Sequence, residues 1–219
     1  MNSIPSLSIM KKLIFILIMT FVFTSMSPLY AAEYPWQLRT SKEGISVYTR
    51  KVENSPILEF KATLILDAPL TTIIPLFEDV NKLTSWYYQC TSSELIKDED
   101  EHNKVLYIVL HLPWPVAQRD SIFRRTKSSN NTNGSISYSI QALPDLLPVK
   151  KGKIRVLMIN SLWRFTPLAE GKTEISFSQH SDPGGSIPAF LVNEEAVDTP
   201  FESLKSFRQL IMKASLRNE

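Results

Sequence analysis

The order of segments along the chain is the feature that most constrains its fold. A series of short strand-like segments is followed by one long amphipathic segment. Eight segments are rich in β-branched and aromatic residues and are bounded by turn residues, which is typical of β-strands. In several of them apolar and polar residues alternate, as expected for strands with one buried face. The segments are residues 45–51, 58–66, 93–97, 104–112, 121–127, 135–142, 153–167 and 173–180. Polar stretches between them are typical of hairpin tips, so we predict a meandering antiparallel sheet.

Two segments have the spacing of helices instead. Residues 69–83 carry apolar side chains every three or four positions, and Pro69 suits the first turn of a helix. The second helix is predicted after the turn at 182–185, with an apolar stripe that continues to Ile211 and a kink at Pro200. Neither the sheet nor this helix can bury its apolar face alone, so we expect the two to pack together.

The N-terminal residues have the three-part layout of a secretory signal peptide. Lys11 and Lys12 precede an apolar run over residues 13–23, and two alanines end the segment. The run is shorter than the roughly 20 apolar residues that usually span a bilayer. We therefore predict a signal peptide over residues 1–32 and an exported, periplasmic or secreted domain over residues 33–219. A retained N-terminal membrane anchor is the alternative.

Charge and cysteine content argue against a nucleic-acid partner and against an internal disulfide. Removal of the two leader lysines leaves 22 Lys and Arg against 22 Asp and Glu, a formal net charge of zero. Nucleic-acid binding requires clustered basic residues that neutralise phosphates, so we expect no nucleic-acid partner. Cys90 is the only cysteine in the chain, which excludes an internal disulfide. We expect one domain that acts as a monomer.

Sequence signatures of common enzymes are missing. The chain contains no G-x-S-x-G, no H-E-x-x-H and no pair of cysteines, so hydrolase and zinc chemistry lack their usual residues. Of the three histidines, His180 lies near Asp182 and is the candidate for an acid–base pair. We expect no catalytic residues, no cofactor and no metal.

Six short motifs, in order along the chain, resemble those of the START family, the steroidogenic-acute-regulatory-related lipid-transfer domains. The motifs cover nearly the whole chain after the predicted leader. They are GISVYTR at 44–50, DVNKLTSWYYQC at 79–90, PWPVAQRD at 113–120, KGKIR at 151–155, LWRFTP at 162–167 and DPGGSIPAFLVN at 182–193.

The resemblance implies an α+β helix-grip fold, in which a curved antiparallel β-sheet wraps around a long C-terminal α-helix with an internal hydrophobic tunnel. It also implies that the protein binds a single lipid, which could be a sterol, a phospholipid or another apolar molecule, and carries it through water with transient membrane contact. Because the wider helix-grip superfamily contains cyclases, a small-molecule cyclase or hydrolase-like enzyme is one alternative. A periplasmic adaptor without a ligand is another.

The resemblance assigns the polar end of the tunnel to Arg119. In sterol-binding members an arginine at a similar position points into the cavity beside a carboxylate. A guanidinium supplies donors that can hold a ligand hydroxyl directly or through water. The alternative is a salt bridge at the end of a strand. Because neighbours alternate across a sheet, Arg119 and Asp120 should face opposite ways.

Further candidate ligand-binding residues follow from strand parity or from the face of the last helix. An error of one residue in parity would move every strand residue of the set to the other face. The candidates are Tyr107, Val109, Tyr138, Met158, Asn160, Phe177, Phe190 and Asn193.

The loop at 142–153 lies where the family has an omega-shaped loop over the tunnel mouth. Leucines in a proline-bounded loop are unfavourable unless they cover something. We therefore predict that Leu143, Leu146 and Leu147 form a gate against the last helix, and that the following lysines touch lipid headgroups. The alternative is a loop packed permanently on its own core.

Overall fold

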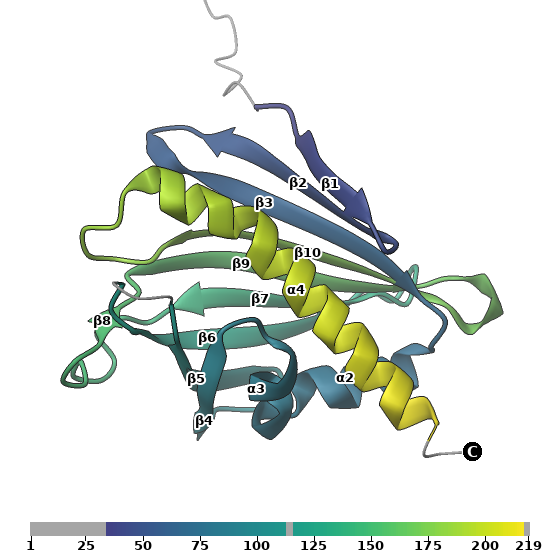
Figure 1. The fold of residues 1–219 in the computed structure, drawn as a ribbon. Coiled ribbons are helices and arrows are strands. Elements are labelled where there is room, and N and C mark those ends of the chain that lie inside the picture. The colour runs from purple at the N-terminus through teal and green to yellow at the C-terminus, as the bar shows by residue number, and fades with distance from the viewer. Residues whose placement is uncertain (1–33, 113–115, 217–219) are drawn as a thin grey trace, which may run out of the picture. The chain divides into compact units, whose positions relative to one another are not determined.

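A ten-stranded sheet with one long helix across it dominates the structure (Figure 1). The computed structural model describes residues 34–112 and 116–216, so the predicted signal peptide lies outside the described residues. The strands are β1 (Gln37–Lys42), β2 (Ile45–Val52), β3 (Ser55–Leu66), β4 (Cys90–Asp98), β5 (Asn103–Leu110), β6 (Arg119–Ser129), β7 (Ile136–Ala142), β8 (Ile154–Arg155), β9 (Met158–Pro167) and β10 (Thr173–Asp182). The α-helices are α2 (Leu70–Glu78), α3 (Leu83–Trp86) and α4 (Ala189–Ser215).

The sheet is antiparallel except where the short β8 pairs in parallel with β6. Its strand order is β1-β2-β3-β10-β9-β7-β6-β5-β4. Thus β3 pairs with β10, and this single pairing joins the first three strands to the remaining ones. The predicted meander is therefore confirmed within each group of strands, and the long-range pairing closes the sheet around α4. The predicted helix-grip class is confirmed.

Two predicted elements are divided in the structure. The predicted helix at 69–83 becomes α2, a 3-10 turn (Val80–Lys82) and α3, because Asp79 has an extended backbone and caps the next turn through its side chain. The predicted strand at 153–167 is broken after β8, and β9 starts at Met158. The exposed strand β1 was not predicted from the sequence.

The helix α4 has two halves with different surroundings. Pro200 lies within it and has no backbone N–H to donate to the preceding turn. After Pro200, the side chains of Phe201, Leu204, Phe207 and Ile211 are buried. Between Ala189 and Thr199 only Ala196 is buried. The second half of α4 therefore packs into the core, whereas the first half covers the sheet more loosely.

Aromatic rings fill the space between the sheet and the second half of α4. The Phe77 ring of α2 lies within 6.1 Å, between ring centroids, of five other aromatic rings, and Trp163 stacks on Phe177 at 3.8 Å. Such aromatic contacts add to the stabilisation from burial alone. This end of the grip is a packed core.

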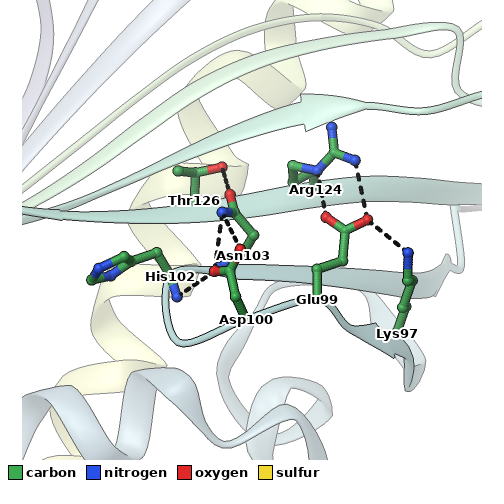
Figure 2. A network of polar contacts seen from close by, with 7 residues as sticks. All are labelled: Lys97, Glu99, Asp100, His102, Asn103, Arg124 and Thr126. Atoms are coloured by element: carbon green, nitrogen blue, oxygen red, sulfur yellow. Dashed lines mark hydrogen bonds and ion pairs between the residues drawn. The ribbon is translucent and has the colours of Figure 1, made fainter.

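A polar network closes the hairpin between β4 and β5 (Figure 2). The Asp100 carboxylate accepts hydrogen bonds from the backbone N–H groups of His102, at 2.7 Å, and Asn103, at 2.8 Å. The Glu99 carboxylate accepts from Arg124 of the neighbouring strand β6 at 2.8 Å. These contacts link the ends of β5 and β6 with the turn that follows the edge strand β4, and they place His102 in that turn.

A second, smaller core lies on the face of β5 and β6 that points away from α4. Val105, Tyr107, Val109 and Ile122 are buried there, and Leu143 packs against them. The residues of β5 from Val105 to Val109 are all buried, so this strand is covered on both faces.

Candidate ligand-binding cavity

A cavity of about 400 Å³ lies between the sheet and the first half of α4. Its wall is mostly apolar and comes from β3, β5, β6, β9, β10 and α4, and from the segments just before β4, β6, β9 and α4. The apolar lining residues are Ile57, Leu58, Phe60, Ile108, Leu110, Leu112, Val116, Val156, Ile159, Ile187, Leu191, Val192 and Ala196. Ligand sites in proteins usually have volumes of about 300–1,000 Å³ and walls of this kind, so the cavity can hold one small apolar molecule.

Arg119 is the cationic residue of the cavity wall. It is 2% exposed, and its guanidinium donates to three backbone carbonyls: Ala117, Gly184 at 3.1 Å and Pro183 at 3.4 Å. Burial lowers its pKa. No carboxylate lies within 4 Å of its nitrogens in the described part of the chain. The positive charge of Arg119 is therefore stabilised by three backbone carbonyl dipoles, and none of the described residues supplies a counter-ion.

Asp120, the next residue, faces the opposite side of the sheet, as predicted. Its carboxylate accepts two hydrogen bonds from Arg155, at 2.9 Å and 3.0 Å. Both side chains are almost fully buried. The alternative expected for this position, a salt bridge at a strand end, therefore applies to Asp120, whereas Arg119 lines the cavity.

Ser121 follows Arg119 on the same face of β6 and also lines the cavity. Ser121 is fully buried, and its hydroxyl has no hydrogen-bond partner among residues 34–112 and 116–216. Buried hydroxyls nearly always have a partner. Strand parity applied from Arg119 could have found this residue, because positions two apart share a face.

A carboxylate lines another part of the wall, on α4. Glu195 accepts hydrogen bonds from the Gln89 amide at 3.3 Å and from the Thr199 hydroxyl at 3.3 Å. Burial raises the pKa of this carboxyl group. Gln89 has a positive φ of 61°, so the turn before β4 holds it in a strained conformation. Neither residue was singled out from the sequence, since an acidic residue on a long helix normally faces solvent.

The cavity continues toward the aromatic core as a small void of about 40 Å³. The two spaces share the lining residues Tyr87, Ile108, Ile159 and Gln179. The void is bounded by Arg125, which donates to the backbone carbonyls of α2, and by Trp86. Polar groups therefore occur along the inner end of the cavity as well.

The structure places four predicted liners on the wrong face of the sheet. On β5 the cavity side carries Ile108 and Leu110, whereas Tyr107 and Val109 lie in the smaller core on the other face. On β9 the cavity side carries Ile159, whereas Met158 and Asn160 are absent from the wall and Asn160 is exposed. The physical reason is parity, since a shift of one residue reverses every side chain.

Two further predicted liners are on the correct face but belong to the packed core. Tyr138 is buried against Phe77 and donates from its hydroxyl to Glu78 at 2.6 Å. Phe177 stacks on Trp163. Both rings were predicted to line the tunnel, but they fill the packed core, and neither lines the cavity under the first half of α4.

The two predicted liners on α4 are also outside the cavity wall. Phe190 is 63% exposed. The Asn193 amide accepts from the backbone N–H of Leu58 at 2.8 Å and donates to the Pro56 carbonyl at 3.1 Å. Asn193 thus attaches the first half of α4 to β3. Of the nine predicted ligand-binding residues, Arg119 is the one that lines the cavity.

The predicted gate loop lies on the outer face of β5 and β6. Leu143 packs into the smaller core, whereas Leu146 and Leu147 are exposed. The Arg155 guanidinium donates to the carbonyls of Pro144 and Leu147 in this loop, so the pair with Asp120 also holds the loop. None of the three leucines lines the cavity, and their gating role stays a prediction.

No histidine is among the described residues that line the cavity. His102 is in the hairpin tip of Figure 2, at the end of β5 opposite Ile108 and Leu110. His180 lies 3.0 Å from the Ser55 hydroxyl, and Asp182 accepts from the Gly184 N–H instead. Outside the undescribed segments, we find no cluster of three metal-ligating side chains and no helix long and apolar enough to cross a bilayer.

A curved antiparallel sheet that grips a C-terminal helix over an apolar cavity defines the helix-grip class of proteins. The sequence pattern of the START domain matches residues 24–213, and this chain belongs to the START domain family.

Individual relatives agree with this assignment. The crystal structure of a STAR-related lipid transfer protein fragment from Xanthomonas axonopodis superposes with a TM-score of 0.76 at 34% identity and covers 81% of this chain and 98% of that one. An uncharacterized Pseudomonas aeruginosa protein is 32% identical over 81% of this chain and 87% of its own length. The human phosphatidylcholine transfer protein is 24% identical over 72% of this chain and 75% of its own length.

Proposed function

We propose that this protein binds one lipid molecule in the cavity under α4 and carries it through water. The observation that carries the proposal is the apolar cavity of about 400 Å³, which lies between α4 and the sheet where a well-packed domain would have side chains. Membership of the START family and the lipid-transfer names of its relatives support it. Burial of apolar ligand surface supplies the binding energy, and the polar wall residues select the ligand.

The first half of α4 and the loop at 142–153 are the proposed contacts with a membrane. Phe190 and Leu191 of α4 are exposed, as are Leu146, Leu147 and Val149 of the loop. The loop and the turn that precedes α4 both contact β8, because Arg155 donates to the Leu147 carbonyl in the loop and Gly184 of the turn lies against the Arg155 backbone. Figure 1 shows that this turn leads directly into the first half of α4. Exposed apolar side chains are suited to a bilayer surface, and those of the loop lie beside Lys150 and Lys151. Movement of the first half of α4 at that surface would release the lipid.

Export is part of the proposal. The signal-like layout of residues 1–32 supports a periplasmic or secreted carrier, with an N-terminal anchor as the alternative. The mass of the protein recovered from its host distinguishes these two arrangements. A mass that lacks about the first 32 residues indicates cleavage and release, and the full-length mass indicates retention.

The direct test is native mass spectrometry of protein purified from its own host, followed by organic extraction of anything bound. One stoichiometric lipid is the expected result. If the protein carries no lipid and takes none up from host lipid extract, the carrier proposal is wrong. A cyclase would instead need an acid–base group at the cavity. The three histidines are outside its wall, and Glu195, whose carboxyl pKa is raised by burial, is the wall residue that would have to take this role.

A further inference from the structure

We infer that the Arg119–Ser121 part of the cavity binds an anionic oxygen group, a carboxylate or a phosphate, at the head of a lipid with one aliphatic chain. This inference rests on the proposed function, because it names the ligand class of the same cavity. It is carried by two buried side chains that are adjacent on one strand face and whose charge and hydrogen-bonding capacity are incompletely satisfied.

The first side chain is Arg119. A guanidinium has five N–H donors, and three backbone carbonyls account for three of its hydrogen bonds. Its charge has no carboxylate partner within 4 Å in the described part of the chain, because Asp120 points to the other face and binds Arg155. A buried charge without a counter-ion is costly. An anionic ligand group would supply the missing counter-charge and use the remaining donors.

The second side chain is Ser121. Its hydroxyl is fully buried, lines the same cavity and lacks a partner among the described residues. The side chains of Arg119 and Ser121 project from the same face of β6, about 7 Å apart along the strand. Both side chains therefore line the same cavity from one strand face, and a ligand bound at the guanidinium could extend to the Ser121 hydroxyl.

The guanidinium is held in place before any ligand arrives. The turn at 183–185 supplies two of its acceptors, the carbonyls of Pro183 and Gly184. A Cβ atom at Gly185 would lie 3.4 Å from Arg119 Nη2, so the glycine allows the turn to close over the guanidinium. A preorganised donor loses little conformational entropy when it binds an anion.

The acidic residues of the wall do not neutralise Arg119. Glu194 and Glu195 both belong to α4, and neither lies within ion-pair distance of Arg119. Glu195 binds Gln89 and Thr199 instead. A neutral hydroxyl on the ligand could satisfy the hydrogen bonds of this subsite but would leave its charge uncompensated. The geometry therefore favours an anion over an alcohol. The cavity volume, near the lower end for ligand sites, favours one chain over two.

The test compares three probes with the same chain and different heads: oleate, oleyl phosphate and oleyl alcohol. Binding to the delipidated full-length protein is measured by calorimetry below the micelle concentration at pH 8. We expect at least one anionic probe to bind ten-fold or more tightly than oleyl alcohol, and the stronger of the two identifies carboxylate or phosphate as the preferred head. Arg119→Gln should remove this preference while oleyl alcohol still binds. Ser121→Ala should weaken anion binding several-fold, and Arg164→Gln, an exposed control on β9, should change nothing.

Equal binding of the alcohol and both anions by the wild type overturns the inference and leaves the carrier proposal standing. So does an Arg119→Gln protein that folds and keeps the preference. If Arg119→Gln does not fold, as judged by circular dichroism, Ser121→Ala decides, and anion binding equal to wild type overturns the subsite. Failure of all three probes together with host lipid extract overturns the carrier proposal itself.

Discussion

Arg119 and Asp120 are adjacent in the chain, but their charges are compensated in different ways. Asp120 forms a buried ion pair with Arg155 through two hydrogen bonds. Arg155 also donates to a backbone carbonyl in the loop that follows β7. Arg119 is held by carbonyl groups and faces the cavity. The alternation of side chains across β6 separates a structural pair from a charge that faces the cavity within two residues.

At this scale we predict that Asp120→Asn is strongly destabilising. The substitution leaves the Arg155 guanidinium buried without its counter-ion, and loss of one partner of a buried pair costs about 3–5 kcal/mol. Asp98→Asn is the matched control, since it breaks the more exposed pair with Lys104 and should cost about 1 kcal/mol or less. Guanidinium chloride denaturation measures both values. Equal losses for the two variants would show that the buried pair is not required.

A second prediction at the residue scale concerns Glu195. Burial raises the pKa of its carboxyl group above the usual 4.5. Between these two pKa values the folded protein keeps a proton that the unfolded chain has lost, so this carboxyl group lowers stability as pH rises through that window. Glu195→Gln should therefore raise the stability relative to wild type more at pH 7 than at pH 4.

Urea denaturation of both proteins at the two pH values measures this difference. Glu53→Gln, which changes an exposed carboxyl group outside the cavity wall, is the control. A stability difference between Glu195→Gln and wild type that is the same at pH 4 and pH 7 would rule out a perturbed carboxyl group.

At the scale of elements, the turn between β10 and α4 holds the cavity together. Its carbonyls bind Arg119, and Gly184 packs against β8. Gly184 has φ +69°, and a Cβ atom there would lie 2.6 Å from the Arg155 carbonyl oxygen. The turn thus requires glycine for both its backbone conformation and its close approach to β8.

We predict that Gly184→Ala destabilises the protein more than a matched glycine substitution does. Gly171 has φ +70°, and a Cβ atom there would have no neighbour within 4 Å, so Gly171→Ala should cost only the conformational strain, about 1–2 kcal/mol. Gly184→Ala adds a clash with backbone, and its loss in chemical denaturation should be clearly larger. Equal losses would indicate that the turn can move away from β8.

The halves of α4 also differ at this scale. Pro200 interrupts its hydrogen-bond ladder near the point where the buried residues begin. The half after Pro200 is fixed by the aromatic core, whereas the half before it covers the cavity and carries Phe190 and Leu191 on its surface. The fold therefore combines, in one continuous helix, a half that packs into the core and a half that covers the cavity.

At the scale of the whole molecule, a cavity takes the place of side-chain packing between the sheet and the first half of α4. We therefore expect a bound ligand to stabilise the folded state as part of the core. A ligand that binds only the folded state at 100 times its Kd stabilises that state by about 2.7 kcal/mol. For a domain of this size the expected rise in Tm is about 5–10 °C. Differential scanning calorimetry of delipidated protein with and without the extracted lipid measures it.

A cavity-filling variant is the control for this experiment. Leu110→Trp places a large side chain in the cavity wall and should abolish the lipid-dependent rise in Tm while the protein still folds. If the lipid raises the Tm of Leu110→Trp as much as that of wild type, the lipid binds somewhere else.

Some features of this site were out of reach of sequence reasoning. The parity of β5 could not be predicted, because Val105–Val109 are buried on both faces and no polar alternation marks the cavity side. The parity of β9 was misassigned because the chain breaks after β8: Val156 and Ile159 both line the cavity, and an unbroken strand through Val156 would put residues 158 and 160 there. Apolar patterns also cannot distinguish Phe177 in a packed core from a residue on a cavity wall.

The order of residues was sufficient to predict the strand and helix periodicity, the START motifs and the opposite orientation of Arg119 and Asp120, because these depend on local geometry and on residues near each other in the chain. The folded chain was needed to show which apolar residues enclose a cavity, that Arg155 pairs with Asp120, and that Glu195 and Gln89 meet at the wall. Those contacts join segments 35 to 106 residues apart, and they depend on strand register, a strand break and the path of α4 across the sheet.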